Sequence, residues 1–411
     1  MNIILRRTLI LLFTFVTVFG SAASCNFFGD EDTSSLRYGI LKNDPSLYQG
    51  GYAFINAVKN FRDNVDRNGL NTQSGIKLVQ YGKDKLFYIA KDKGLFRTDN
   101  GGKEWKRIYV YPIKGSEKKE WDVEISNNDA LKITDSSFVN DENFYIAGTK
   151  NDISYLYKTI DGGKSFTEIY NTESNGKKVY IEHVLANPDN ANQNTVFVAT
   201  SGGGIFKTID AGSTWKNISI PEVSNDLPLQ MGYLSQYGNR LFLIFRGSGM
   251  YVSENSGESF VKKTITFAKQ GTDNLNFDLS FSTNIDKLIQ SPSTQDVIII
   301  ADRTIYTSTN LEGEFRLLRL PVEPSKININ DVAIDPREGV NRLVLSVDNK
   351  LFESRDRGTT WTANDKINQP GIQYGNIGQI IIDPQDTNVV YLMLLDPNYR
   401  RGDSSGFFFG L

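Results

Sequence analysis

Few residues in this chain could carry covalent or metal chemistry. Among its 411 residues there is one cysteine, Cys25, and one histidine, His183. A disulfide needs two cysteines and a Cys/His zinc site needs several ligands, so both are excluded. His183 lies in the apolar run Tyr180–Leu185, a setting typical of a packed, hydrogen-bonded histidine rather than a catalyst. We therefore expect no metal, no cofactor and no catalytic residue.

Carboxylates are the remaining candidates for catalysis. Glycoside hydrolysis needs two of them about 5–10 Å apart on either side of a sugar bond. The 48 acidic residues leave such a pair open without nominating one. A glycoside hydrolase thus stays an alternative interpretation.

Two short motifs resemble the sequences of known binding sites. Gly162–Ser165 resembles a phosphate-binding loop, but that pattern needs glycine where Lys158 stands and a helix where a strand pattern follows. Arg401–Asp403 spells an integrin-type tripeptide, which a chain of this length can contain by chance. We take neither as a site.

Composition excludes one class of partner and indicates the type of fold. The 45 basic and 48 acidic residues give a net charge of −3, so the chain lacks the basic surface that nucleic acid binding requires. Aromatic residues make up 12% and the chain has 35 glycines, which is typical of a folded, β-rich protein rather than a disordered one.

One motif recurs along the chain: Ser or Thr, any residue, Asp or Asn, any residue, Gly, two residues, then an aromatic. Good copies begin at Thr98, Thr159, Thr208, Ser253 and Ser354, and a worn copy runs over 308–315. The closing aromatics lie 61, 49, 45, 55 and 46 residues apart. A period near 50 accommodates four short strands with their turns, so the chain repeats one four-stranded unit.

The strands of each unit can be read from β-branched and aromatic runs. In the sixth unit they are 328–334, 342–347, 350–353 and 360–363, and Asp335-Pro336 ends the first of them. Short sheets with two apolar faces are buried best when arranged radially, as the blades of a propeller.

The recurring motifs resemble the Asp-box (BNR) repeats of sialidases, sortilin-type receptors, xyloglucanase-type glycosidases and photosystem II assembly-factor propellers. The resemblance covers residues 76–411 and implies turns between the third and fourth strands of each blade, on the face opposite the usual ligand site. It implies a structural role, not a catalytic one, for the following residues: Thr98, Asn100, Gly102, Trp105, Thr159, Asp161, Gly163, Phe166, Thr208, Asp210, Gly212, Trp215, Ser253, Asn255, Gly257, Phe260, Ser354, Asp356, Gly358 and Trp361. The Arg-Ile-Pro motif of sialidases does not occur in this sequence.

We predict an all-β fold: a seven-bladed β-propeller of four-stranded antiparallel blades over 36–411, closed by an N-terminal strand. Segments 378–383, 389–395 and 406–411 resemble three strands of a last blade, and 36–41 would supply the missing strand. Segment 53–65 has helical apolar spacing and predicts a short amphipathic helix, although it could instead supply the closing strand.

Two long connections, 111–131 and 262–284, would lie on the ligand face. The first contains Trp121, the one tryptophan outside an Asp-box, together with Lys118 and Lys119. One hypothesis is a recognition surface for a glycan or a protein; the alternative is a solvated loop with Trp121 in the core.

The N-terminus is typical of an exported protein. Arg6 and Arg7 precede the apolar run Leu9–Phe19, which is too short to span a bilayer. Ala22–Ser24 before Cys25 resembles the lipobox of bacterial lipoproteins, which implies a signal peptide over 1–24 and acylation of Cys25. The alternative is an ordinary signal peptide, and 25–35 resembles a polar tether.

These observations together predict a monomeric, lipid-anchored propeller of the cell envelope, with the outer membrane favoured over the inner one because no Asp follows Cys25. Its partner would be an envelope protein or a polysaccharide.

Overall fold

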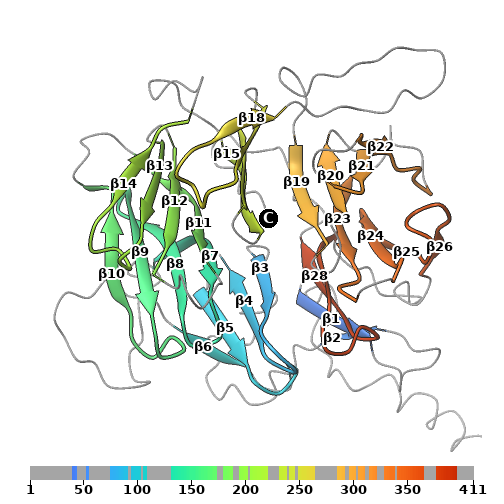
Figure 1. The fold of residues 1–411 in the computed structure, drawn as a ribbon. Helices are drawn as coiled ribbons and strands as arrows, with labels where there is room; N and C mark the ends of the chain where they lie inside the picture. Colours follow the sequence, from blue (N-terminus) through green and yellow to red (C-terminus); the bar gives the residue numbers. More distant parts are fainter. Residues whose placement is uncertain are drawn as a thin grey trace, which may run out of the picture. The chain divides into compact units, whose positions relative to one another are not determined.

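A computed structural model gives the fold (Figure 1). The chain divides into two units, Met1–Arg37 and Tyr38–Leu411. All described residues belong to the second unit: 39–43, 52–54, 75–90, 94–102, 105–108, 131–173, 179–187, 194–201, 204–220, 231–237, 240–245, 249–263, 285–291, 296–301, 304–310, 314–321, 328–337, 340–364 and 376–395.

The second unit is a β-propeller, and six of its sheets are four-stranded antiparallel blades formed by consecutive strands. Blade 1 consists of β3 (Gly75–Gln80), β4 (Leu86–Ala90), β5 (Gly94–Thr98) and β6 (Lys106–Ile108). Blade 2 consists of β7 (Lys132–Phe138), β8 (Phe144–Lys150), β9 (Ile153–Thr159) and β10 (Thr167–Asn171). Blade 3 consists of β11 (Ile181–Ala186), β12 (Val196–Thr200), β13 (Gly204–Thr208) and β14 (Lys216–Ile218).

The other three blades repeat the arrangement. Blade 4 consists of β15 (Met231–Tyr237), β16 (Arg240–Phe245), β17 (Gly249–Ser253) and β18 (Val261–Lys263). Blade 5 consists of β19 (Ile285–Gln290), β20 (Val297–Ala301), β21 (Thr304–Ser308) and β22 (Arg316–Leu317). Blade 6 consists of β23 (Ile329–Ile334), β24 (Leu343–Val347), β25 (Lys350–Ser354) and β26 (Thr362–Ala363). The described residues contain no helix long and apolar enough to cross a membrane.

One further sheet joins the two ends of the unit. This terminal sheet has the order β2-β1-β28-β27, with β27 (Asn376–Ile382) and β28 (Val390–Leu395) from the C-terminal side and β1 (Gly39–Asn43) and β2 (Tyr52–Phe54) from the N-terminal side. In Figure 1 the blue β1 and β2 lie beside the red β28.

One prediction about this sheet needs correction. We predicted that 406–411 would be its third strand, but β1, which overlaps the predicted N-terminal strand 36–41, occupies the place beside β28, with Leu41 opposite Leu392; residues 406–411 lie outside the described ones. For 53–65 we left open a short helix or the closing strand. Its first residues belong to strand β2, which pairs with the otherwise unpaired edge of β1, and residues 55–65 lie outside the described ones.

Apolar side chains fill the spaces between neighbouring sheets. Every residue of β20 is buried because blade 5 is covered on both faces. One of these faces contacts blade 4, where Phe242 and Ile299 share a cluster, and the other contacts blade 6, where Ile300 and Leu345 do. The terminal sheet packs in the same way on blade 6 and on blade 1.

The Asp-box segments form the turns between the third and fourth strands. In blade 2 the Thr159 hydroxyl donates to Asp161 Oδ1 at 2.8 Å and accepts from the Gly163 amide at 2.9 Å. Asp161 also accepts from the amide and hydroxyl of Ser165, at 2.9 and 2.6 Å. The closing aromatic then reaches the preceding blade: Trp215 Nε1 donates to the Ile169 carbonyl at 3.2 Å. Each turn therefore fixes the position of its own blade against the preceding one.

The glycine of the turn is under two constraints, which Gly163 illustrates. Its φ is +88°, and a Cβ atom there would lie 2.8 Å from Ile108 Cγ2 of blade 1. We expect Gly163→Ala to destabilise the protein by about 1–3 kcal/mol, because the new methyl group is both strained and overpacked. Urea unfolding measures the change.

Ser256 is the matched control, since it also has a positive φ, of 53°, in the equivalent region of the blade 4 turn. Removing its Cβ atom in Ser256→Gly should leave stability unchanged or raise it by up to about 1 kcal/mol. A Gly163→Ala variant as stable as the wild type would contradict this account of the turn.

Candidate functional site

The first strands of neighbouring sheets lie against one another and form the inner edge of the propeller. Each has a β-bulge at the same place, so that one residue per strand is offset from the regular register. All the residues that follow the bulge are polar or aromatic-polar: Lys77, Asp135, His183, Tyr233, Lys287, Asp331 and Gln379. We call this set, without Tyr233, the inner belt.

Belt side chains hydrogen-bond the backbone of the next sheet. Asp135 Oδ2 accepts from the Val184 amide at 2.9 Å, and Asp331 Oδ2 accepts from the Ile380 amide at 2.8 Å. Gln379 exchanges two hydrogen bonds with Leu78, at 2.7 and 2.9 Å, and so links the terminal sheet to blade 1. Each acceptor satisfies a donor that would otherwise be buried without a partner.

The two lysines of the belt form ion pairs with its two carboxylates. Lys287 Nζ lies 2.5 Å from Asp331 Oδ1, and the Asp331 side chain is 1% exposed. Lys77 Nζ lies 3.4 Å from Asp135 Oδ1. Burial alone would raise the pKa of Asp135, but Lys77, His183 and the Val184 amide outweigh it and hold that pKa below its ordinary value.

His183 is the one belt member with an unused group. Its Nδ1 lies 3.8 Å from Asp135 Oδ2. Its Nε2 is buried and has no hydrogen-bond partner within the described part of the chain. The histidine is thus packed, as its apolar strand predicts, but only one side of the ring faces a polar group.

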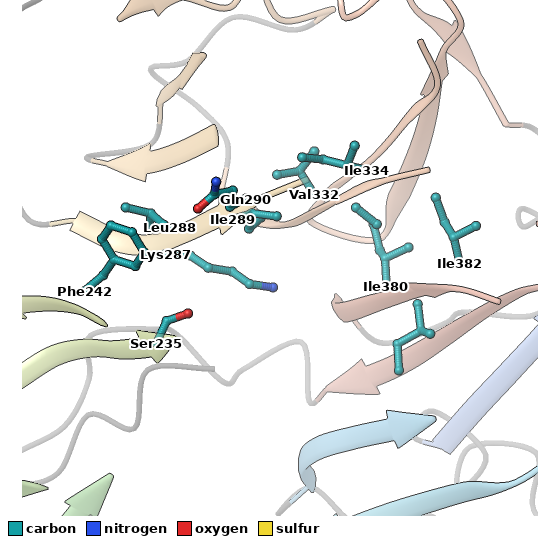
Figure 2. Close-up of a pocket in the computed structure, with 12 residues that line it drawn as sticks. Ser235, Phe242, Lys287, Leu288, Ile289, Gln290, Val332, Ile334, Ile380 and Ile382 are labelled. Atoms are coloured by element: carbon teal, nitrogen blue, oxygen red, sulfur yellow. The ribbon is translucent and has the colours of Figure 1, made fainter. Parts of the chain in front are cut away.

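A cavity of about 340 Å³, which we call the central cavity, opens beside the belt, between the inner strands β15, β19, β23 and β27 (Figure 2). Its walls are largely branched aliphatic side chains, including Ile289, Val332 and Ile380, and its polar groups come from Ser235, Lys287 and Gln290. Oε1 of Gln290 is buried and accepts no hydrogen bond from the described residues. An apolar group that carries a neighbouring N–H donor would satisfy both features of this cavity.

The carboxylates of the inner belt are poorly suited to acid–base catalysis. Asp135 and Asp331 are each hydrogen-bonded by two backbone amides and paired with a lysine, and for Asp135 the pKa lies below its ordinary value. A general acid needs the opposite environment. The described residues also contain no cluster of side chains that could hold a metal ion.

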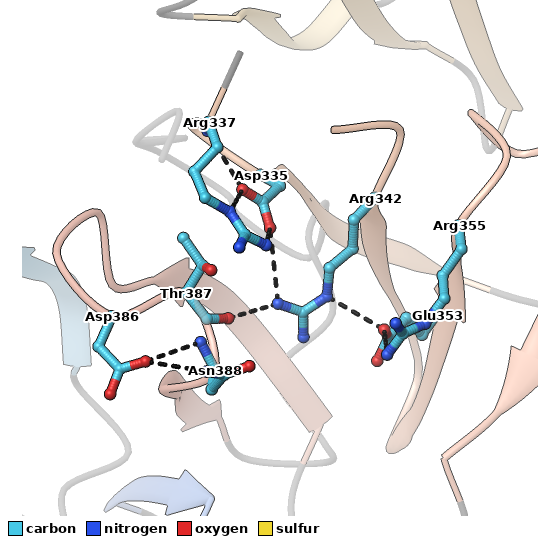
Figure 3. Close-up of polar contacts among 8 residues, drawn as sticks. All are labelled: Asp335, Arg337, Arg342, Glu353, Arg355, Asp386, Thr387 and Asn388. Carbon is cyan, nitrogen blue, oxygen red and sulfur yellow. Dashed lines mark hydrogen bonds and ion pairs between the residues drawn. The ribbon is translucent and has the colours of Figure 1, made fainter. Parts of the chain in front are cut away.

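A second polar network joins blade 6 to the terminal sheet (Figure 3). Asp335, whose side chain is fully buried, pairs with Arg337 at 2.9 Å and lies 3.7 Å from Arg342. Arg342 also donates to Glu353 at 3.1 Å and to the Thr387 carbonyl. Burial would raise the pKa of Asp335, but the two arginines lower it. The sequence predicted only a strand end at Asp335-Pro336. Arg337 and Arg342, two and seven residues after Asp335, were the signal for this network.

Several predicted site residues lie outside the described residues, namely Cys25, Lys118, Lys119 and Trp121, and so does the tripeptide Arg401–Asp403, which we did not take as a site. The Asp-box residues lie on turns between the outer two strands of each blade, away from the first strands that carry the belt. Gly162–Ser165 is part of such a turn, and β10 follows it instead of a helix. Sequence reasoning missed the belt, because the bulge that aligns its members is visible only in the register.

The pKa of Asp135 makes a prediction about stability. A carboxyl group whose pKa is lowered on folding stabilises the protein above its unfolded pKa of about 3.9, and this contribution is lost as pH falls through the folded value. Asp135→Asn should cost about 1–3 kcal/mol at pH 7 and should lose less stability than the wild type between pH 7 and pH 3. Unfolding at both pH values measures this, and Glu142→Gln, at an exposed acid of the same blade, should leave the difference unchanged. Equal losses in Asp135→Asn and the wild type would count against the belt.

The sequence matches no protein-family model and no curated protein. Its structure is similar to one described as "YCF48 bound to D1 peptide", with a TM-score of 0.52 and 16% identity over 80% of this chain and 94% of that one. YCF48 from Cyanidioschyzon merolae gives a TM-score of 0.51 and 14% identity over 78% and 96% of the two chains.

A GH74 enzyme from Niastella koreensis gives a TM-score of 0.54 and 16% identity over 77% of this chain, which spans only 50% of that enzyme. Identities this low show a shared fold and no more. The chain is a β-propeller similar in fold to YCF48 and to GH74 propellers.

Proposed function

We propose that this chain is a non-catalytic binding module whose central cavity takes an apolar side chain from an extended segment of a partner protein. The observation that carries the proposal is the cavity itself, at about 340 Å³ within the size range of ligand pockets. Rigid inner strands form its walls, so binding requires little ordering of the protein. Gln290 Oε1, which lacks a donor among the described residues, would accept from a backbone amide of the segment.

Protein rather than glycan is the partner we favour. The aliphatic walls offer no aromatic platform for a sugar ring apart from Phe242. A propeller of similar fold has been described with a bound peptide, which supports the same class of ligand here by analogy. A polysaccharide remains the second ligand class, and its capture would revise the proposal.

The module would be held at a membrane. Acylation of Cys25 after removal of 1–24 would place two or more acyl chains in the bilayer, each contributing about 0.8 kcal/mol per buried methylene. We propose the outer membrane as its location and 25–35 as the tether. The partner would then be another envelope protein that the module helps to assemble or to hold.

We also propose that the terminal sheet is a seventh blade, through which the propeller closes. Its support is packing on both faces and the hydrogen bonds of Gln379 to Leu78, which join positions 301 residues apart. Closure by strands from both ends would couple the rigidity of the central cavity to the N-terminal segment.

Filling the cavity tests the binding proposal. Ser235→Trp places a large side chain in the cavity wall, whereas Ser219→Trp, at an exposed residue that does not line the cavity, is the control. After cross-linking in intact cells, we expect one discrete protein adduct, reduced at least tenfold by Ser235→Trp and unchanged by Ser219→Trp. Equal adducts in both variants would contradict the proposal, and sugar release from xyloglucan or sialosides would favour the glycoside hydrolase instead.

Truncation tests closure. A mature chain without residues 26–35 should unfold at the wild-type temperature, because it keeps β1 and β2. A chain without residues 26–54 loses both strands and exposes the edge of β28, so it should melt at a markedly lower temperature or aggregate. Calorimetry and size-exclusion chromatography measure the two effects. Identical melting of both truncated chains would refute a closing role for β1 and β2.

A further inference from the structure

Three blades carry a basic residue immediately before their Asp-box: Arg97, Lys158 and Lys207. In two of them the cation is neutralised by the next blade. Arg97 donates to the Asp141 carbonyl at 3.1 Å and pairs with the Asp141 carboxylate at 3.4 Å. Lys207, 8% exposed at its side chain, pairs with Glu258 at 2.5 Å and donates to the Ser256 carbonyl at 2.9 Å.

Lys158 has the same position in blade 2 but no such partner. The residues of blade 3 equivalent to Ser256 and Glu258 are Ala211 and Ser213. The backbone geometry of the two turns is the same, because the Ser213 amide donates to the Asp210 carbonyl and the Glu258 amide to the Asn255 carbonyl, both at 3.3 Å. Blade 3 thus has the right geometry but a hydroxymethyl group where blade 4 supplies a carboxylate.

Within the described part of the chain, the ammonium group of Lys158 therefore has no anionic partner. No carboxylate of the described residues lies within ion-pair distance, and its Nζ faces the Tyr145 ring, 5.8 Å from the centroid. Burial lowers the pKa of Lys158, the effect expected of a cation that loses water without gaining a counter-ion. The nearby Glu168 is engaged elsewhere, since its Oε1 accepts from Asn171 at 2.7 Å.

A hollow of about 500 Å³ lies at this place, between the Asp-box turns of blades 2 and 3. We call it the rim hollow; its lining includes Lys158, Thr167, Ala211 and Ser213, the hydrogen-bonded Glu168, and Ile160, which is 65% exposed. A carboxylate and an apolar side chain are what this lining leaves without partners.

The adjoining outer strand also differs from its counterparts. At five residues, β10 is the longest outer strand of the six blades, and it contains no lysine or arginine. The outer strands β6, β14, β18 and β22 each contain at least one, which is a common protection of exposed strand edges, and the two-residue β26 contains none. Trp215 Nε1 donates to the Ile169 carbonyl, and Thr167, the one exposed residue of β10, lines the hollow.

We propose that the rim hollow binds an acidic, apolar segment of a partner protein: a carboxylate of the segment pairs with Lys158, as Glu258 pairs with Lys207, and a neighbouring apolar side chain covers Ile160. This site is separate from the central cavity and does not depend on it. The occupant is defined by charge complementarity with a half-buried, unneutralised ammonium group.

Two labelled synthetic peptides test the site on the full-length protein: one alternates valine with glutamate and the other alternates valine with lysine. Fluorescence anisotropy should show binding of the acidic peptide only. Lys158→Gln should weaken it at least tenfold. Ser213→Glu should do the same, because it supplies from within the carboxylate that blade 4 already has, and its melting temperature should be equal to or above that of the wild type.

The exposed isoleucines provide a matched pair. Ile160→Asp should weaken the acidic peptide at least tenfold, whereas Ile209→Asp, at the equivalent and 68% exposed position of blade 3, should not. Ser235→Trp should leave this binding unchanged, so failure of the central site and failure of the rim site are distinguishable.

Three results would overturn the proposal: no binding of the acidic peptide, equal binding of both peptides, or unaltered binding by Lys158→Gln. Self-association of the wild type that Lys158→Gln abolishes would identify a second copy as the occupant and would overturn it as well.

Discussion

Burial of both faces of every blade is the constraint on which the structure depends. A four-stranded sheet whose middle strands are apolar on both sides, such as blade 5, is stable only with a neighbour on each face. Each blade thus supplies half of two cores, and none is an independent folding unit. Polar function is consequently restricted to the edges of the sheets, where the two sites proposed here lie.

At the inner edge of the sheets, backbone N–H groups need hydrogen-bond acceptors. Bulges free one N–H group per strand from regular pairing, and a buried amide without an acceptor costs about 1–3 kcal/mol. Asp135, Asp331 and Gln379 accept these amides from the next sheet, so the belt both satisfies the backbone and aligns neighbouring sheets. The lysines then pair with the carboxylates, so that the belt carries both the hydrogen bonds and the ion pairs of the inner edge.

The sequence was informative wherever one residue type is required by local geometry. The spacing of Thr159, Asp161 and Gly163 predicted a turn because only such residues make its hydrogen bonds and positive φ. It was uninformative where a contact joins distant segments. The count of strands predicted an N-terminal strand in the last sheet, but neither its place beside β28 nor the surroundings of Lys158, because these depend on which residues of another segment lie opposite.

The repeated blades supply part of this missing information. Because each blade places equivalent residues in equivalent positions, one blade predicts what its neighbour requires, and a departure from the pattern needs a separate explanation. Glu258 shows that the position before an Asp-box is stable with a carboxylate from the next turn. Ser213 removes that carboxylate while Lys158 keeps the charge. The proposal of a partner at the rim hollow rests on this departure from the repeat, together with the hollow beside it.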